Sequence, residues 1–137
     1  MVVLGRVKGT TQYSDIHRHP DNEEIPQYKV IRIESSIFYF NQQFVYQHIL
    51  QIINKESDIK LLVIAMSSSP AIDVSASKMF LKLQKNLDQR GISLRVVNTI
   101  SGVRELLRKQ GLEKSIGHIS RKVSTDQVIA DFEESKK

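Results

Sequence analysis

Hydrophobic residues form short runs and periodic stripes that predict alternating strands and helices. Residues 60–66 (KLLVIAM) contain a continuous apolar run of strand length, which is typical of a parallel strand covered on both faces of a sheet. Residues 29–34 (KVIRIE) and 92–97 (ISLRVV) also have strand character, and the β-branched and aromatic run at residues 36–40 (SIFYF) predicts one more strand. We therefore expect a sheet in which residues 60–66 have parallel neighbours.

Helices are predicted where capping residues precede apolar residues at helical spacing. The first helix follows Asn41 as its N-cap. The second begins after Asp73, a strong N-cap residue, and ends at Arg90 with Gly91 just beyond it. The buried stripe expected along the first helix comprises Phe44, Val45, His48, Ile49, Ile52 and Ile53.

Two further helices are expected in the last third of the chain. The third closes at Gly111, and Leu112 is placed for the hydrophobic contact that follows such an ending. The fourth begins at a capping box formed by Ser124 and Gln127. Between them, residues 118–120 predict a short strand.

The second predicted helix has one apolar and one basic face. The residues expected to be buried are Ala76, Phe80, Leu83 and Leu87. The residues expected to face solvent are Lys78, Lys82, Lys85 and Gln89. These lysines belong to a basic middle region, since residues 71–123 hold eleven Lys and Arg against four Asp and Glu. Such a region is either a solvated helical face or a surface for a nucleotide, an acidic protein or lipid headgroups.

Residues 5–27 differ from the rest in lacking a clear period. Gly5, Gly9, Pro20 and Pro26 interrupt this polar stretch, which we expect to be ordered but irregular. The remaining order of strands and helices describes an α/β sandwich with a mostly parallel central sheet. In such sheets, sites gather at the carboxyl ends of strands and the starts of the following helices. The turn after Met66 is therefore the best candidate for a site.

Length and composition remove several classes of protein. A chain of 137 residues with net charge +5 has about the size of one domain. The absence of cysteine excludes disulfides, thiolate metal sites and a cysteine nucleophile. The apolar runs are shorter than the roughly 18 residues of a membrane span, and the N-terminus lacks the pattern of a signal peptide. The basic region carries no interleaved aromatic residues beyond Phe80, so nucleic acid is not an expected partner.

Hydroxyl groups gather where the strand at residues 60–66 leads into the second helix. Residues 67–77 contain five serines and Asp73. Ser75 is expected in the first helical turn, where amides and the helix dipole stabilise a phosphate, whether covalent or carried by a ligand. Asp73 and Ser75 are thus a candidate phosphorylation or switch site, and Ser75, Ser77 and Lys78 are candidate contacts for an anion or nucleotide. Removing the Asp73 cap is expected to cost roughly 1 kcal/mol.

Catalysis and metal binding have no comparable support. The sequence lacks the glycine patterns of nucleotide-binding loops and the GxSxG pattern of serine hydrolases. His17 and His19, even with Asp15 or Asp21 nearby, do not form a set of three or four placed ligands. We expect no enzyme activity, no cofactor and no transition-metal binding.

Several stretches resemble the STAS domain, the cytoplasmic C-terminal domain of SulP anion transporters, which is named for sulfate transporters and anti-sigma-factor antagonists. Residues 4–20, which begin LGRVKGT, resemble the opening that follows the last membrane helix of these transporters. Residues 37–41 (IFYFN) resemble the run before the family's first helix, and residues 72–76 (IDVSA) resemble its switch loop. Residues 103–112 (VRELLRKQGL) resemble its third helix.

The resemblance implies an α/β STAS fold, like that of anti-sigma-factor antagonists, with a mostly parallel mixed sheet and about four flanking helices. Residues 1–28 would be the segment that follows an absent last membrane helix, and residues 29–137 the STAS domain. Ser75 corresponds to the serine that a kinase modifies in the antagonists, beside Asp73. The implied location is the cytoplasmic side of the inner (plasma) membrane.

The same resemblance implies the function and the partners. The domain would regulate a transporter of sulfate, bicarbonate or a dicarboxylate by docking on the membrane domain of the same polypeptide. A second copy of the domain, a nucleotide or an acyl carrier protein are further implied partners. One alternative is a free-standing anti-sigma-factor antagonist that acts as a phospho-switch, and another is a small enzyme of flavodoxin-like fold.

Overall fold

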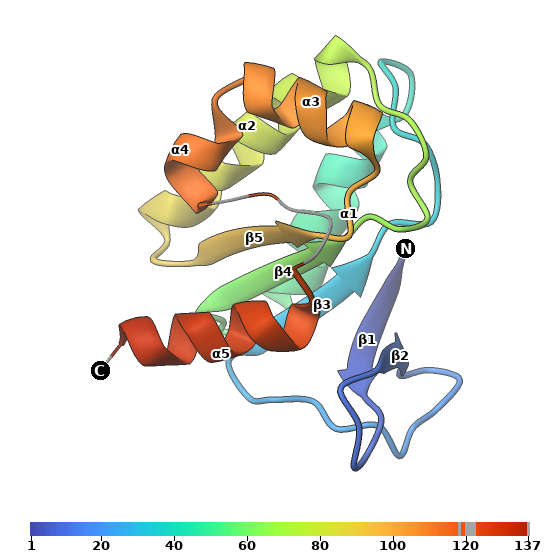
Figure 1. The fold of residues 1–137 in the computed structure, drawn as a ribbon, viewed down its shortest axis with the longest axis vertical. Coiled ribbons are helices and arrows are strands. Elements are labelled where there is room, and N and C mark those ends of the chain that lie inside the picture. Colours follow the sequence, from blue (N-terminus) through green and yellow to red (C-terminus); the bar gives the residue numbers. More distant parts are fainter. Residues whose placement is uncertain (118, 120–122, 137) are drawn as a thin grey trace.

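Five strands form one mixed sheet in the computed structural model, which describes residues 1–117, 119 and 123–136 (Figure 1). The strands are β1 (Val2–Arg6), β2 (Tyr13–Asp15), β3 (Tyr28–Arg32), β4 (Leu61–Ala65) and β5 (Ser93–Val97). They lie in the order β2-β1-β3-β4-β5. β3, β4 and β5 are parallel to one another, whereas β1 is antiparallel to both of its neighbours.

β4 lies inside the sheet and is covered on both faces, as its continuous apolar run predicts. All five of its residues are buried. Leu62 and Ile64 belong to one hydrophobic cluster, whereas Leu61, Val63 and Ala65 belong to a second. Successive side chains of a strand point to opposite faces of the sheet, so the two clusters are the two halves of the core.

Five helices cover the two faces unequally, where about four were expected. They are α1 (Gln42–Asn54), α2 (Val74–Gln89), α3 (Ser101–Lys109), α4 (Leu112–Ile116) and α5 (Thr125–Ser135). Buried residues of α1 to α4 belong to the first cluster, and those of α5 to the second, so α5 is the one helix among the described residues that covers the opposite face (Figure 1). Ser124 caps α5, because its Oγ accepts a hydrogen bond of 3.1 Å from the amide of Gln127.

The opening segment is more regular than the sequence predicts. β1 and β2 lie within residues 1–28, and β1 inserts between β2 and β3, with Leu4 opposite Val30. Glycine at position 5 allows β1 to lie close to the residues at 22–23. A Cβ atom at Gly5 would lie 3.0 Å from Asn22 Cβ and 3.1 Å from the carbonyl oxygen of Glu23. The expectation of an irregular segment is therefore wrong for residues 5–6 and 13–15, which belong to β1 and β2, because β1 pairs both with β2 and with the distant β3.

The strand predicted at residues 36–40 is also wrong. Ile37 forms a single bridge with Ile72, and the residues after it form a turn in which Tyr39 and Phe40 are exposed. This segment is a loop from β3 to α1. Of the short strand predicted at residues 118–120, residues 118 and 120 lie outside the described residues, and Ile119 is in no strand.

The first helix begins after Asn41 as expected, but without the side-chain cap and with a different buried face. The side chain of Asn41 does not cap α1; its Oδ1 accepts a hydrogen bond from the amide of Phe38. Phe44, expected in the buried stripe, is 71% exposed, and Tyr46 is buried instead. His48 lies on the same side as Phe44 and is partly buried. The third helix closes at Gly111 as predicted, and Leu112 is buried as the first residue of α4.

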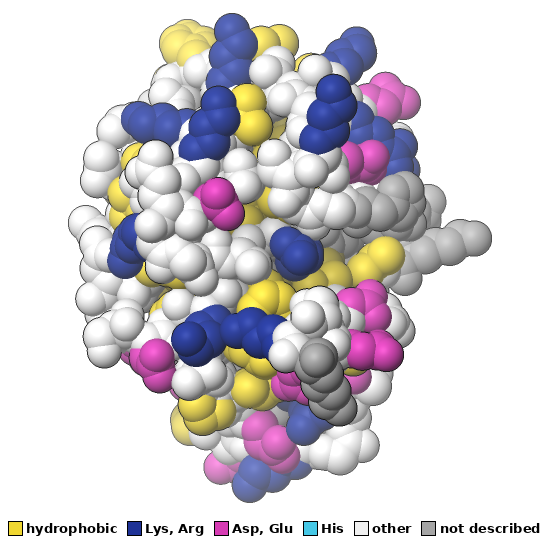
Figure 2. Space-filling view, turned by 90° about the vertical axis from the view of Figure 1, so that its left-hand side faces the viewer, with side chains coloured by type: hydrophobic (Ala, Val, Ile, Leu, Met, Phe, Trp, Pro, Cys, Tyr) yellow, Lys and Arg dark blue, Asp and Glu magenta, His cyan; other side chains and the backbone are white. Residues whose placement is uncertain are grey.

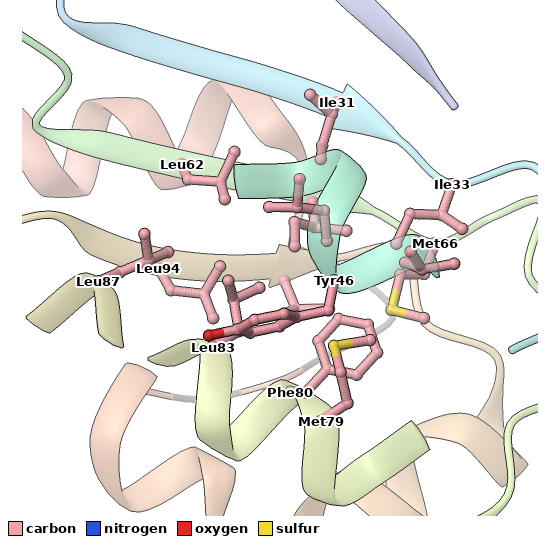
Figure 3. Close-up of a cluster of buried hydrophobic side chains, with 14 of the residues drawn as sticks. Ile31, Ile33, Tyr46, Leu62, Met66, Met79, Phe80, Leu83, Leu87 and Leu94 are labelled. Carbon is pink, nitrogen blue, oxygen red and sulfur yellow. The ribbon is translucent and has the colours of Figure 1, made fainter. Parts of the chain in front are cut away.

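Side chains of α2 occupy the centre of the larger cluster. Phe80, Leu83 and Leu87 are completely buried and point from α2 toward the sheet (Figure 3). Tyr46 of α1 lies beside them, and the Nζ atom of Lys82 lies 4.7 Å from the centroid of its ring. These contacts fix the position of α2, whose first turn carries the predicted site.

No helix within the described residues is long and apolar enough to cross a membrane.

Candidate functional site at the start of α2

Asp73 caps α2, as its place after the β4 turn predicts. Its backbone is extended (φ −105°, ψ −180°), and its Oδ1 accepts a hydrogen bond of 2.9 Å from the amide of Ala76. This is the usual geometry of an aspartate N-cap. Asp73 therefore begins α2 at the carboxyl edge of the sheet, the edge at which β3, β4 and β5 end.

The second carboxylate oxygen of Asp73 makes a contact that the sequence did not indicate. Oδ2 accepts a hydrogen bond of 2.8 Å from the amide of Tyr39, in the loop before α1. The amide of Asp73 in turn donates to the carbonyl of Ile37, and the amide of Ile37 donates to the carbonyl of Ala71. The start of α2 and the loop before α1 are thus one hydrogen-bonded unit.

The other predicted site residues differ in accessibility. Ser75 lies in the first turn of α2 and is partly exposed, and Lys78 is exposed one turn later. Ser77 is 1% exposed, and its Oγ donates a hydrogen bond of 2.7 Å to the carbonyl of Val74. A phosphate placed at this helix start would therefore meet Ser75 and Lys78 before it met Ser77. Their roles in phosphorylation or anion binding stay predictions.

A polar hollow lies at the same edge of the sheet, at the carboxyl ends of β4 and β5. It has a volume of about 510 Å³ and is lined by Ser67, Asn98, Thr99, Ile100, Ser101 and Arg104. The guanidinium of Arg104 reaches back across α3, donating to the carbonyl of Thr99 at 2.9 Å and to its Oγ1 at 3.3 Å. The rule that sites gather at this edge indicated the region. No local motif singled out Arg104, because its contacts depend on how the β5–α3 loop turns.

On the face that Figure 2 shows, the described Lys and Arg side chains are scattered. Figure 2 views the molecule from the side opposite to the carboxyl edge, and Lys and Arg side chains are spread over its upper part. On α2, Lys78, Lys82 and Lys85 are exposed as predicted. This distribution fits a solvated helical face on that side of the molecule.

The histidines that the structure describes show no metal-binding arrangement. His17 and His19 are exposed, and the amide of His17 donates to the carboxylate of Asp15. Among the residues that the structure describes, no group of three or more His, Cys, Asp or Glu side chains is placed to hold a metal ion. The expectation that the domain binds no transition metal stays a prediction, and calorimetry with Zn²⁺ tests it.

Tyr13, in the opening segment, is placed so that the stability of the fold should change with pH in the alkaline range. The Tyr13 hydroxyl donates to Oδ1 of Asp126 at 3.4 Å, which connects β2 to α5. Burial, followed by the nearby Asp126 carboxylate, raises the pKa of Tyr13 to about 12. Both effects favour the neutral phenol in the folded state.

We therefore expect Tyr13 to stabilise the fold fully below its ordinary pKa of 10.0, and to lose this contribution as the pH rises through about 12. Urea unfolding of the wild type and Tyr13→Phe at increasing pH measures the effect. The variant should be less stable at neutral pH by about 1 kcal/mol or less, and the difference should shrink above pH 10. Tyr39→Phe, at an exposed position, is the matched control. A constant difference across this range would contradict the assignment.

The family of the chain follows from comparison with known proteins. A family model described as the STAS domain matches residues 19–125, which include β3 to β5 and the whole of the Asp73 site. The chain belongs to the STAS domain family. This STAS domain has a mixed sheet flanked by helices, so the fold implied by the sequence resemblance is confirmed.

The relatives of this STAS domain in sequence are sulfate transporters. It is 32% identical over 139 aligned residues to high affinity sulfate transporter 2 of Stylosanthes hamata, an alignment that covers 95% of this chain and 21% of the transporter. The chain thus spans about a fifth of the length of this relative.

Two solved structures are similar to the STAS domain in fold. One is the murine Solute Carrier 26 family member A9 anion transporter in the inward-facing state, with a TM-score of 0.83 and 18% identity, over 96% of this chain and 22% of that one. The other is the STAS domain of a SulP transporter from Vibrio cholerae, with a TM-score of 0.66 and 15% identity, over 88% of this chain and 93% of that one.

Proposed function

We propose that this STAS domain is the cytoplasmic, C-terminal regulatory domain of a SulP-family secondary anion transporter. The observation that carries the proposal is the alignment with a sulfate transporter across 95% of this chain but only 21% of the relative. Sulfate is the transported anion we favour over bicarbonate or a dicarboxylate, because the sequence relatives are named as sulfate transporters. The domain itself would act by docking and by binding partners, and not as an enzyme.

The opening segment would connect the domain to a preceding membrane helix. We propose residues 1–28 as this connection and residues 29–137 as the domain proper. β1 supports a rigid connection, because it pairs with β3 over three residue pairs and with β2 on its other side. A displacement of the membrane helix would then reach the sheet without a flexible linker between them.

Uptake of labelled sulfate tests the proposed function. Cells that lack their own sulfate transporter would express the full-length protein, or the same protein without this domain. We expect the full-length protein to restore uptake and the deletion to reduce it at equal membrane abundance. A full-length open reading frame without membrane spans would instead favour the alternative, a free-standing anti-sigma-factor antagonist.

Ser75 is the position at which we propose that regulation acts. A phosphate there would lie near the first amides of α2 and near Lys78, and it would add a charge of about −1.5 to −2. Because Ser75 is partly exposed, the fold should tolerate this charge. The same helix start could receive the phosphate of a nucleotide, and the exposed basic residues could contact an acidic acyl carrier protein or a second copy of the domain.

Transport by Ser75 variants distinguishes a regulatory from a structural serine. We expect Ser75→Asp to change sulfate uptake or docking by the full-length protein, while the melting temperature of the domain shifts by only a few degrees. Ser75→Ala should leave the fold unchanged. Ser68→Asp places the same charge on an exposed serine of the preceding turn and is the matched control. Equal uptake by the wild type and both Ser75 variants, at matched expression, would contradict the switch.

A further inference from the structure

The large hydrophobic side chains that remain exposed lie at one edge of the molecule. Among the described residues they are Tyr39, Phe40, Phe44, Val74 and Ile100, with exposures from 40% to 75%. Each belongs to a loop that leaves the carboxyl end of a strand or to the first residues of the helix that follows. We call these five residues the apolar edge. Hydrophobic side chains gathered in this way mark a surface that contacts a protein or a membrane.

The chain also enters the domain at this edge. β1 is antiparallel to β3, and Val2 lies opposite Arg32, so Met1 lies where β3 ends (Figure 1). Met1 lines a hollow of about 190 Å³ together with Phe44 and His48. A segment that preceded residue 1 would therefore arrive beside the aromatic rings.

Two aromatic rings of the apolar edge contact each other. The rings of Tyr39 and Phe40 are in edge-to-face contact with centroids 5.5 Å apart, and Phe38 lies 5.8 Å from Phe40. The hydrogen bond from the Tyr39 amide to Asp73 holds this loop against α2 and brings it near Val74. The rings are thus displayed on a fixed backbone.

Basic groups accompany the apolar edge. Lys78 is exposed one helical turn after Val74, and Arg104 lines the polar hollow beside Ile100. Arg32 ends β3, although Glu34 partly offsets its charge through an ion pair of 3.2 Å. The carboxylate of Asp73 is occupied by two backbone amides. Glu105 is exposed one turn into α3. The edge therefore combines aromatic rings with basic side chains, among which acidic side chains also lie.

We propose that the apolar edge rests on the surface of an anionic lipid bilayer, with its aromatic rings at headgroup depth. This inference rests on the proposed function, because a membrane helix preceding residue 1 would hold this edge against the bilayer. Aromatic rings are favoured at the membrane–water interface, and Lys and Arg are attracted to anionic headgroups. A lipid surface accommodates both features, because the rings and the basic side chains lie at the edge where a preceding membrane helix would enter the domain.

A single tryptophan tests the position of the edge. The chain contains no tryptophan, so Phe40→Trp places one fluorophore in the apolar edge, and Gln89→Trp places one at the far end of α2 as the matched control. Each protein would be attached through an N-terminal histidine tag to phosphatidylcholine vesicles containing phosphatidylglycerol and a nickel-chelating lipid. Attachment at the N-terminus puts residue 1 where the membrane helix would put it and makes weak contacts observable.

We expect the indole emission of Phe40→Trp to shift to shorter wavelength on attachment and to become protected from iodide, while that of Gln89→Trp does not change. Phe44→Trp, also at an exposed position, should behave like Phe40→Trp. It keeps the test valid if one of the two variants fails to fold. Emission that stays the same for both edge positions would overturn the proposal, and it would favour a protein surface as the occupant.

The charge contribution is tested without the tag. Lys78→Gln should weaken sedimentation with phosphatidylglycerol vesicles roughly fivefold, whereas Lys85→Gln, exposed toward the far end of α2, should change it less than twofold. Equal effects of the two substitutions would contradict a membrane-facing edge. The outcome is independent of the uptake experiment, because vesicle contact can be absent in a working transporter and present in a protein that transports nothing.

Discussion

Replacing Asp73 with alanine is expected to lower the free energy of unfolding by about 2.5–4 kcal/mol. The sequence alone indicated only the loss of an N-cap, worth roughly 1 kcal/mol. The structure adds a second hydrogen bond, from the amide of Tyr39 to Oδ2, and a bond to a charged acceptor contributes about 1.5–3 kcal/mol. Asp73→Ala removes both acceptors and should loosen the loop before α1 as well as the start of α2.

Asp73→Asn separates the two contributions. Asparagine retains one side-chain oxygen for the amide of Ala76, but its NH₂ group cannot accept a hydrogen bond from the amide of Tyr39. Urea unfolding should therefore place Asp73→Asn between the wild type and Asp73→Ala. Hydrogen exchange should show faster exchange of the Tyr39 amide in both variants. Equal stability of all three proteins would mean that solvent replaces these contacts at no cost.

Phe80→Ala is expected to have a larger effect, about 3–5 kcal/mol. Phe80 is completely buried in the cluster between α2 and the sheet (Figure 3). Alanine would lose the transfer free energy of the ring and leave a cavity that the surrounding side chains fill only in part. Because Phe80 lies on the helix that carries Ser75, the variant should also disturb the geometry of the candidate switch site.

Phe80→Leu keeps most of the apolar volume and is the matched control for the cavity. Its free energy of unfolding should fall by less than half as much as that of Phe80→Ala. Urea unfolding followed by circular dichroism measures both variants. A loss below about 1 kcal/mol for Phe80→Ala would mean that the core collapses around the missing ring.

The central elements could be predicted because their signals are local. The apolar run that forms β4 is buried on both faces, and the sequence indicates this directly through its lack of alternation. The start of α2 depends on one aspartate and its own next turn, and Gly91 ends that helix with a positive φ of 72°. These features need no information from distant residues.

The errors fall where distant contacts decide the outcome. Residues 36–40 have the composition of a strand, yet Ile37 finds only one bridge, to Ile72, and the residues after it turn toward α1. β1 is a strand because Leu4 pairs with Val30, a partner far along the chain that no local pattern specifies. Strand preference depends strongly on such neighbours.

The candidate site was predicted in part for the same reason. Asp73 and Ser75 lie where the capping pattern puts them, but the bond from the Tyr39 amide to Asp73 joins segments 34 residues apart. Phe44 matches the helical period of a buried stripe and is nevertheless exposed, because α1 turns Tyr46 toward the core instead. The apolar edge could not be predicted, because it forms only when the β3–α1, β4–α2 and β5–α3 connections come together at the same end of the sheet.

The insertion of β1 between β2 and β3 determines where the domain can be cut. A fragment limited to the matched residues 19–125 would lack β1 and β2 and almost all of α5. β3 would then become an edge strand with unpaired backbone groups, which invites pairing with other chains and aggregation. The face now covered by Phe132 and its neighbours in α5 would be open to water. The matched residues 19–125 are thus too few to cover both faces of the sheet, and a stable fragment of this chain also needs β1, β2 and α5.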